Sequence, residues 1–285
     1  MEKGLFFDSV GCIPDPDRYL ERIGYKGKIE VNKRCLDELI VAHHYTVPFE
    51  NLDVCDLNRP IVLTPEHLYD KIVLHNRGGY CFEMNGAFLF LLKALGFTVT
   101  PAYCRVARAD ALSPILHRGV LIYLDDKTYF CDVGFGGVMS PEALLMEDGY
   151  SIQAGPERFT IKHYDGSWYE LVGDSPYRIN RDGKLERIEK TDLLISKELG
   201  FCGDFDMFND RCQAPGSNFH NRRTAVLRTP TGQIAINNNT YNIIDGDKLT
   251  SRTLTREERR KVMAEDFGLV FTDEEWDSIP ERDFQ

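Results

Sequence analysis

A cysteine that could act as a nucleophile, Cys81, directly follows the segment Arg77-Gly78-Gly79-Tyr80. Residues 82–95 are nearly all apolar or compatible with a helix, and Gly96 follows them, which predicts a buried helix that begins near Cys81. The glycine pair lets the backbone turn sharply into this helix. A thiol at a helix N-terminus is stabilised as the thiolate, which is the nucleophilic form of cysteine. Cys81 is therefore a candidate nucleophile.

The alternative for Cys81 is a purely structural role, because cysteine is among the most buried residue types and most of the eight cysteines should be small core residues. Its context favours catalysis. A thiol at the mouth of a buried helix needs only a base and an orienting group from elsewhere in the fold.

A histidine and an aspartate that could supply these groups lie on a predicted β-hairpin. Residues 115–124 and 128–133 have strand patterns, and Asp125-Asp126-Lys127 between them is typical of a turn. If the two aspartates of this turn are its only unpaired residues, His117 lies diagonally across from Asp132 on the same face. Such neighbours are roughly 7 to 8 Å apart at their Cα atoms, within reach of an imidazole and a carboxylate. We therefore expect a triad of Cys81, His117 and Asp132.

Three blocks of the sequence resemble the arylamine N-acetyltransferase family. The first is RGGYCFEMN at residues 77–85, followed by the His117 strand and by DVGFG at residues 132–136. The second is VPFENLD at residues 47–53, and a weaker third block covers residues 209–219. The blocks are in the family's order and span most of the chain, so the resemblance is far more specific than any single motif.

The resemblance implies an activity and its substrates. An acetyl group would pass from acetyl-CoA to Cys81 as a thioester, and then to an arylamine, arylhydrazine or N-hydroxyarylamine, in a ping-pong mechanism of cytoplasmic xenobiotic metabolism. In this scheme His117 shuttles protons and Asp132 fixes its tautomer. The resemblance also implies contacts with the two substrates: Phe49 and Phe135 with the acceptor, and Ser217 with coenzyme A. We also expect Leu116 to contact coenzyme A. The glycines at 134, 136 and 137 could cradle a phosphate of coenzyme A, with Gly136 as the contact, although glycines that end a strand more often form turns.

Two further features follow from the resemblance. It places Glu50 and Asp53 beside Arg77, so we expect Arg77 to be buried and paired with Glu50 as a structural support for the loop that presents Cys81. The pair Arg118-Gly119 departs from the family, whose members usually continue with apolar residues after the histidine.

The sequence pattern divides the chain into three parts. Residues 1–96 are mostly helical and carry the nucleophile, residues 97–200 contain short strands that carry the histidine and aspartate, and residues 201–285 contain strands and two helices that begin with capping boxes. The resemblance implies an α+β fold with a cysteine-protease-like core: an N-terminal helical bundle, a central antiparallel β-barrel and a C-terminal α/β lid.

Three helices are expected before the nucleophile, at residues 17–23, 33–40 and 65–73, with Thr64 capping the third. His43 and His44 could bind a metal by residue type, but no acidic or cysteine partners stand at ligand spacing, so we predict no metal site.

Composition limits the remaining classes. The net charge of −11 and the scattered lysines and arginines argue against nucleic acid as a partner. No apolar run reaches about 18 residues and no targeting signal is present. We therefore expect no membrane partner, and we expect the protein to be cytosolic. Eight cysteines without a CxxC pair indicate neither a zinc site nor a disulfide framework. A homo-oligomer stays open.

Other functions remain compatible with the same thiol triad. A family member could instead close an amide bond on a carrier-bound biosynthetic intermediate, or a related thiol enzyme could hydrolyse or cross-link peptides, as papain-like proteases and transglutaminases do. A non-catalytic binding protein is a third alternative.

Overall fold

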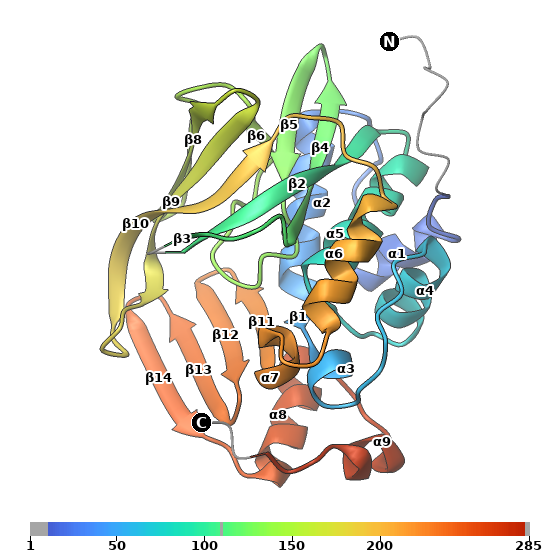
Figure 1. Ribbon diagram of the computed structural model, residues 1–285, viewed down its shortest axis with the longest axis vertical. Helices are drawn as coiled ribbons and strands as arrows, with labels where there is room; N and C mark the ends of the chain where they lie inside the picture. Colours follow the sequence, from blue (N-terminus) through green and yellow to red (C-terminus); the bar gives the residue numbers. More distant parts are fainter. Residues whose placement is uncertain (1–10, 109–110, 283–285) are drawn as a thin grey trace.

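The computed structural model describes residues 11–108 and 111–282 (Figure 1). Most of the helices precede the long sheet in the chain, and the last two lie beside the C-terminal sheet. The helices are α1 (Pro16–Arg22), α2 (Lys33–Thr46), α3 (Leu52–Cys55), α4 (Pro65–Tyr69), α5 (Cys81–Ala94), α6 (Asp204–Gln213), α7 (Asn218–Asn221), α8 (Arg256–Phe267) and α9 (Asp273–Ser278).

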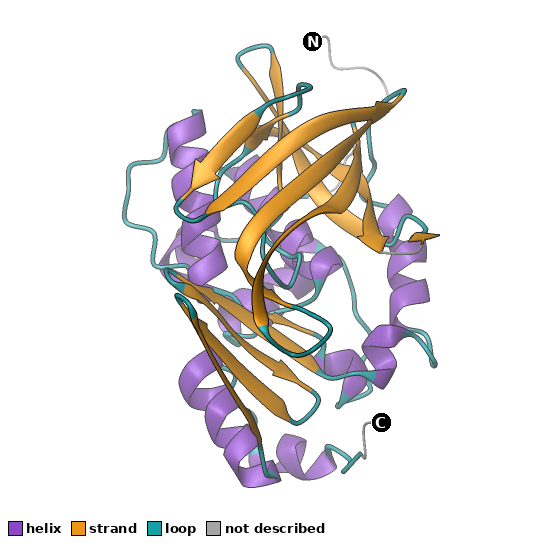
Figure 2. Ribbon diagram, turned by 90° about the vertical axis from the view of Figure 1, so that its left-hand side faces the viewer, coloured by secondary structure: helices purple, strands orange, loops and turns teal. Residues whose placement is uncertain are grey.

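A long antiparallel sheet forms the middle of the molecule, with strand order β6-β5-β4-β2-β10-β9-β8-β7 and with β3 paired to β2. Figure 2 shows that this sheet is strongly curved, so that it forms much of a barrel. Its strands are β2 (Thr98–Arg108), β3 (Ala111–Leu112), β4 (His117–Leu124), β5 (Lys127–Cys131), β6 (Leu144–Leu145), β7 (Ser151–Ala154), β8 (Glu157–Asp165), β9 (Trp168–Ile179) and β10 (Leu185–Ser196).

A second antiparallel sheet lies toward the C-terminus, with order β1-β11-β12-β13-β14. Together with the helices, the two sheets confirm the predicted α+β class. The strands are β1 (Phe49–Glu50), β11 (Thr224–Thr229), β12 (Gly232–Asn237), β13 (Thr240–Asp245) and β14 (Lys248–Thr253).

Helix α5 is the centre of the core. All of its residues from Cys81 to Leu92 are buried, because the helix packs on β2 and β4 on one side and on α1 and α4 on the other. A helix that is apolar around its whole circumference must be enclosed in this way. The predicted helix over residues 82–95 is therefore confirmed, within one residue at each end.

The other predicted helices differ from the structure at their ends. Helix α2 continues to Thr46, beyond the expected end at residue 40. Thr64 caps α4 as expected, by accepting a hydrogen bond from the backbone N–H of His67 at 3.4 Å. Beyond Tyr69, however, the chain changes to a π-helical turn, η1 (Asp70–Leu74).

The predicted N-terminal helical part also supplies a strand to the C-terminal sheet. Phe49 pairs with Val226 and Glu50 with Ala225, so β1 becomes the edge of that sheet beside β11. This two-residue strand is too short to show period-2 alternation in the sequence, and it depends on a partner more than 170 residues away.

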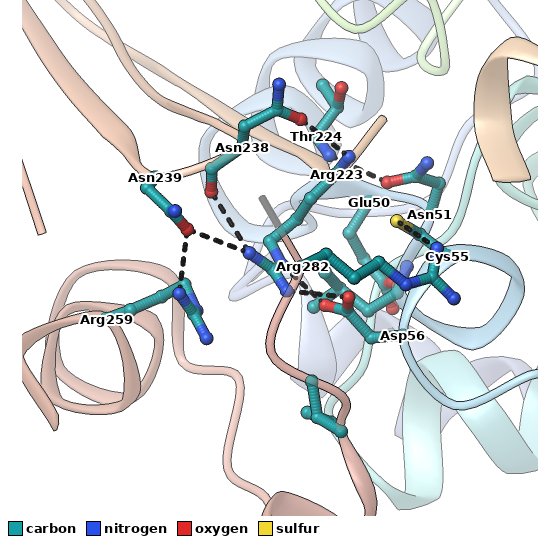
Figure 3. Close-up of polar contacts among 12 residues, drawn as sticks. Glu50, Asn51, Cys55, Asp56, Arg223, Thr224, Asn238, Asn239, Arg259 and Arg282 are labelled. Carbon is teal, nitrogen blue, oxygen red and sulfur yellow. Dashed lines mark hydrogen bonds and ion pairs between the residues drawn. The ribbon is translucent and has the colours of Figure 1, made fainter. Parts of the chain in front are cut away.

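A buried ion pair joins the start of β11 in the C-terminal sheet to the end of α3 (Figure 3). Arg223, just before β11, donates from Nε and Nη2 to both carboxylate oxygens of Asp56 at 2.6 and 2.8 Å. Asn239 accepts hydrogen bonds from Arg223 and from Arg259 of α8. Nearby, Asn51 accepts from the backbone N–H of Thr224 at 2.8 Å. These contacts fix the segment that carries Phe49 and Glu50.

None of the helices formed by the described residues combines the length and apolarity needed to cross a bilayer.

Candidate active site

Cys81 is the first residue of α5, and it is almost fully buried at 2% exposure. Glu83 caps this helix, because its carboxylate accepts a hydrogen bond from the backbone N–H of Tyr80 at 3.0 Å. The two preceding glycines are required by close contacts. A Cβ atom on Gly78 would lie 1.8 Å from the carbonyl oxygen of Pro48, and one on Gly79 would lie 2.7 Å from the Glu83 side chain.

The hairpin brings His117 and Asp132 together as its register predicted. Leu124 pairs with Lys127, and both turn residues, Asp125 and Asp126, have positive φ angles of 51° and 58°. These angles belong to the two-residue type I′ turn that matches strand twist. His117 Nε2 then lies 2.6 Å from Asp132 Oδ2, and both side chains are buried.

The electrostatics of this pair favour a charged imidazole. Burial alone lowers the pKa of His117, but the Asp132 carboxylate and the Cys81 side chain raise it, to about 10. The Cys81 side chain is also a hydrogen-bond partner of this histidine. Burial raises the pKa of Asp132. His117, Asn85 and the backbone of Gly134 have the opposite and larger effect, so the pKa of this carboxyl group is below its ordinary value. At neutral pH this arrangement stabilises an imidazolium at His117, beside the carboxylate of Asp132.

A buried charge cluster lies beneath the loop that presents Cys81. Arg77 donates from Nε and Nη2 to Glu50 Oε1 at 3.0 and 2.8 Å, and from Nη2 to Asp53 at 3.1 Å. The expected contact between Arg77 and Glu50 is therefore present. Lys71 adds a second cation, at 2.7 Å from Asp53 and 2.6 Å from Glu83. The sequence reading did not single out Lys71 or Glu83.

A cleft of about 1000 Å³ opens at Cys81 and His117. Phe49 and Phe135 line it, and the ring of Phe135 stands edge-on to the imidazole of His117 at 5.8 Å between centroids. This volume leaves room for a large ligand beside the Cys81 thiol. Its wall also contains Leu116, Ser217, Met207, Phe208, Arg211 and Arg222.

Comparison with known proteins identifies the family. A model of the N-acetyltransferase family matches residues 34–276. The arylamine N-acetyltransferase of the Gallus gallus pineal gland is 31% identical over 279 residues, which cover 90% of this chain and 94% of that protein. The chain belongs to the arylamine N-acetyltransferase family.

Other members of the family resemble parts or all of the chain. The arylamine N-acetyltransferase of Escherichia coli is 43% identical over 126 residues, which cover 44% of this chain and 44% of that protein. The chain spans about half the length of the curated bacterial relatives that it matches first. An arylamine N-acetyltransferase of Mycobacterium marinum, solved in complex with CoA, has 25% identity and a TM-score of 0.80, with 90% of this chain and 93% of that chain covered.

One residue of the family-like block has a role that sequence reasoning missed. Asn85 donates from Nδ2 to Asp132 Oδ1 at 2.7 Å and to the carbonyl of Arg118 at 2.6 Å, and it accepts from the backbone N–H of Val133 at 2.8 Å. Asn85 follows Cys81 by four residues, so both lie on one face of α5. That four-residue spacing is the signal in the sequence that could have predicted a role for Asn85 beside Cys81.

Gly136, a predicted contact of coenzyme A, does not lie in the wall of the large cleft. It has a positive φ of 73°, and a Cβ atom there would lie 2.8 Å from the ring of Phe49. It lines a separate cavity of about 20 Å³ with His44 and Arg228. Its packing against Phe49 therefore explains the glycine without a bound phosphate.

The adjacent histidines of α2 have structural partners. His43 lies 3.0 Å from the hydroxyl of Tyr19, and His44 lies 3.0 Å from the carbonyl oxygen of Asp132. Burial lowers the pKa of both, that of His44 to about 4, so both are neutral. Within residues 11–108 and 111–282, no group of three or more His, Cys, Asp or Glu side chains is arranged to hold a metal ion.

The Arg118-Gly119 pair continues β4 without a break, opposite Tyr103 and Ala102 of β2. A Cβ atom on Gly119 would lie 2.3 Å from the ring of Phe130, so the glycine leaves room for that ring. Arg118 points into the protein and is completely buried.

Proposed function

We propose that this protein transfers an acetyl group from acetyl-CoA to an arylamine, arylhydrazine or N-hydroxyarylamine through a thioester on Cys81. The observation that carries the proposal is the buried Asp132 carboxylate 2.6 Å from His117, whose imidazole also has the Cys81 side chain as a partner. Family membership and the CoA complex of the Mycobacterium marinum relative support the choice of donor.

In the first half-reaction the Cys81 thiolate attacks the thioester carbonyl of acetyl-CoA. The tetrahedral intermediate then expels the CoA sulfur, which takes a proton from the His117 imidazolium. In the second half-reaction the amine attacks the acyl-Cys81 carbonyl, the C–S bond of the thioester breaks to release the Cys81 thiolate, and His117 takes the proton that the amine loses. Asp132 holds the imidazole in the orientation that both transfers need, and it stabilises the positive charge.

The cleft contains expected contacts of both substrates. Phe49 and Phe135 offer aromatic surface beside the thiol, which suits an aryl acceptor. Leu116 and Ser217 line the same cleft and would contact CoA.

Steady-state kinetics with acetyl-CoA and a panel of arylamines and arylhydrazines test the proposal. A ping-pong mechanism predicts parallel double-reciprocal lines. Intersecting lines, or turnover of casein or peptide glutamine in place of aryl acceptors, would contradict it.

A further inference from the structure

Arg118 is a completely buried arginine whose guanidinium is only partly satisfied. Its exposure is 0%, and neither Nε nor Nη1 has a hydrogen-bond partner. Among the residues that the structure describes, no carboxylate oxygen bonds Nε or Nη1, and Nη2 bonds a sulfur atom. Arginine keeps its charge in proteins, and a buried charge is costly unless it is paired, so Arg118 needs a counter-charge.

Aromatic rings and the catalytic helix surround this cation. The guanidinium carbon lies 5.0 Å from the ring centre of Phe205 in α6 and 5.8 Å from that of Phe90 in α5. Gly86 gives it room, because a Cβ atom there would lie 2.9 Å from Nη1. Ring faces stabilise a cation in part, but they carry no net negative charge.

The hydrogen-bond acceptor for Arg118 is a sulfur atom. Its Nη2 donates to Cys202 Sγ at 3.3 Å, and Cys202 lies between β10 and α6 with 8% of its surface exposed. A thiol beside an arginine loses its proton more readily than a free thiol, and the resulting thiolate supplies the missing negative charge. We propose that Arg118 holds Cys202 as a thiolate, which makes Cys202 a second nucleophilic sulfur in this chain and a site of oxidation by peroxide.

The oxidation step balances with peroxide as the only co-reactant. The Cys202 sulfur attacks one oxygen of hydrogen peroxide, the O–O bond breaks, and the other oxygen leaves as hydroxide. Sulfur is oxidised to the sulfenic acid, and peroxide is reduced. The nitrogens of Arg118 that have no partner remain available to bind the new oxygen.

The other buried cysteines provide internal references. Burial raises the pKa of Cys104 and of Cys131 well above the ordinary value, and each of these residues is 3% exposed or less. Cys12 is exposed and serves as the accessible reference. All of these thiols can be followed in one sample by peptide mapping.

The experiment is alkylation of the 285-residue chain with iodoacetamide over a range of pH, read out for each cysteine by mass spectrometry. The reaction midpoint reports ionisation, and the plateau rate reports access. We expect a midpoint for Cys202 below about 7.5, the upper limit for a thiol activated by a neighbouring cation. Cys104 and Cys131 should stay unmodified at neutral pH. A parallel reaction with hydrogen peroxide, trapped with dimedone, should label Cys202.

Three variants make the test specific. Arg118→Met removes the charge at similar length and should slow the reaction of Cys202 at neutral pH at least tenfold, whereas Arg118→Lys should keep the low midpoint. Arg105→Met is the matched control, because Arg105 lies on β2 and stacks on Trp168 at 5.2 Å, away from Cys202.

The proposal would be overturned if Cys202 in the parent protein titrated like Cys131. It would also be overturned if Arg118→Met left the alkylation midpoint of Cys202 unchanged. If Arg118→Met does not fold, the parent profile still decides. If iodoacetamide reaches Cys202 too slowly, the thiolate absorbance of the parent minus that of Cys202→Ser gives the same midpoint. This test is independent of the acetyltransferase activity.

Discussion

The amide of Asn85 lies 2.7 Å from the carboxylate of Asp132, so the helix that begins with Cys81 also orients the carboxylate of the proposed triad. Asn85 bonds Oδ1, while His117 bonds Oδ2. Cys81 and the His117–Asp132 pair come from different parts of the chain, and this contact fixes their relative positions.

Asn85→Ala should therefore slow acetylation of Cys81 more than it weakens acetyl-CoA binding. A hydrogen bond to a charged group contributes about 1.5 to 3 kcal/mol, which corresponds to a loss in rate of about 10- to 100-fold. Single-turnover kinetics would measure it. Asn180→Ala is a suitable control, because Asn180 bonds Glu186 in an exposed turn away from the site. A parent-like rate for Asn85→Ala would show that the contact serves only the fold.

Asp132→Asn should reduce the rate of acetyl transfer more than Asn85→Ala does. The amide keeps the shape of the side chain but can favour the wrong tautomer of His117, and related triads lose about 10⁴-fold in kcat. We expect a loss of about 10³-fold or more. Asp192→Asn is the matched control, since Asp192 is also buried and pairs with Arg178 at 2.6 Å. An active Asp132→Asn enzyme would mean that Asp132 is only structural.

Arg77→Gln should destabilise the protein while sparing the chemistry. The guanidinium is buried between Glu50 and Asp53, and removing one partner of a buried pair costs about 3 to 5 kcal/mol. Arg158→Gln removes an arginine that is 49% exposed, where about 0 to 1 kcal/mol is expected. Denaturant unfolding would compare the two variants.

The folded fraction of Arg77→Gln should still acetylate Cys81. If this variant unfolds like the parent but reacts slowly, Arg77 acts on the thiolate by its charge and does not serve as a support.

Glu83 gives the buried cluster a pH dependence. Burial raises its pKa, Lys71 lowers it, and Asp53 and Glu50 raise it again, to about 7 from an ordinary 4.5. Between these values the folded protein keeps a proton that the unfolded chain releases, so this group makes stability fall as pH rises.

Glu83→Gln should reduce the loss of folding stability that accompanies rising pH. The difference in melting temperature between about pH 5 and about pH 8 should shrink relative to the parent. Glu142→Gln, which changes a carboxylate at 3.3 Å from Lys33 on the surface, is the control. An unchanged difference for Glu83→Gln would show that Glu83 does not titrate in this range.

Local patterns were sufficient to predict the parts of the site that local geometry determines. The apolar run after Cys81 defines α5, and the two aspartates at 125 and 126 set the register that pairs His117 with Asp132. In both cases a few neighbouring residues decide the backbone, so the sequence carries the information.

The contacts that depend on distant partners could not be read in the same way. The pairing of Phe49 with Val226 and the burial of Arg118 against Phe205 both need the tertiary structure. Helix α6 was not predicted either, since its apolar residues are few. Its Asn209 accepts a hydrogen bond from the hydroxyl of Tyr80, the residue before Cys81.

Acetylation of Cys81 is the most direct test of the proposed function. The protein would be incubated with acetyl-CoA in the absence of an acceptor, and then examined by intact mass and peptide mapping. The triad predicts the mass of one acetyl group on the peptide that contains Cys81, its loss when an arylamine is added, and no such adduct in a folded Cys81→Ala variant. An unmodified Cys81, or an acetyl group that persists in Cys81→Ala, would contradict the account.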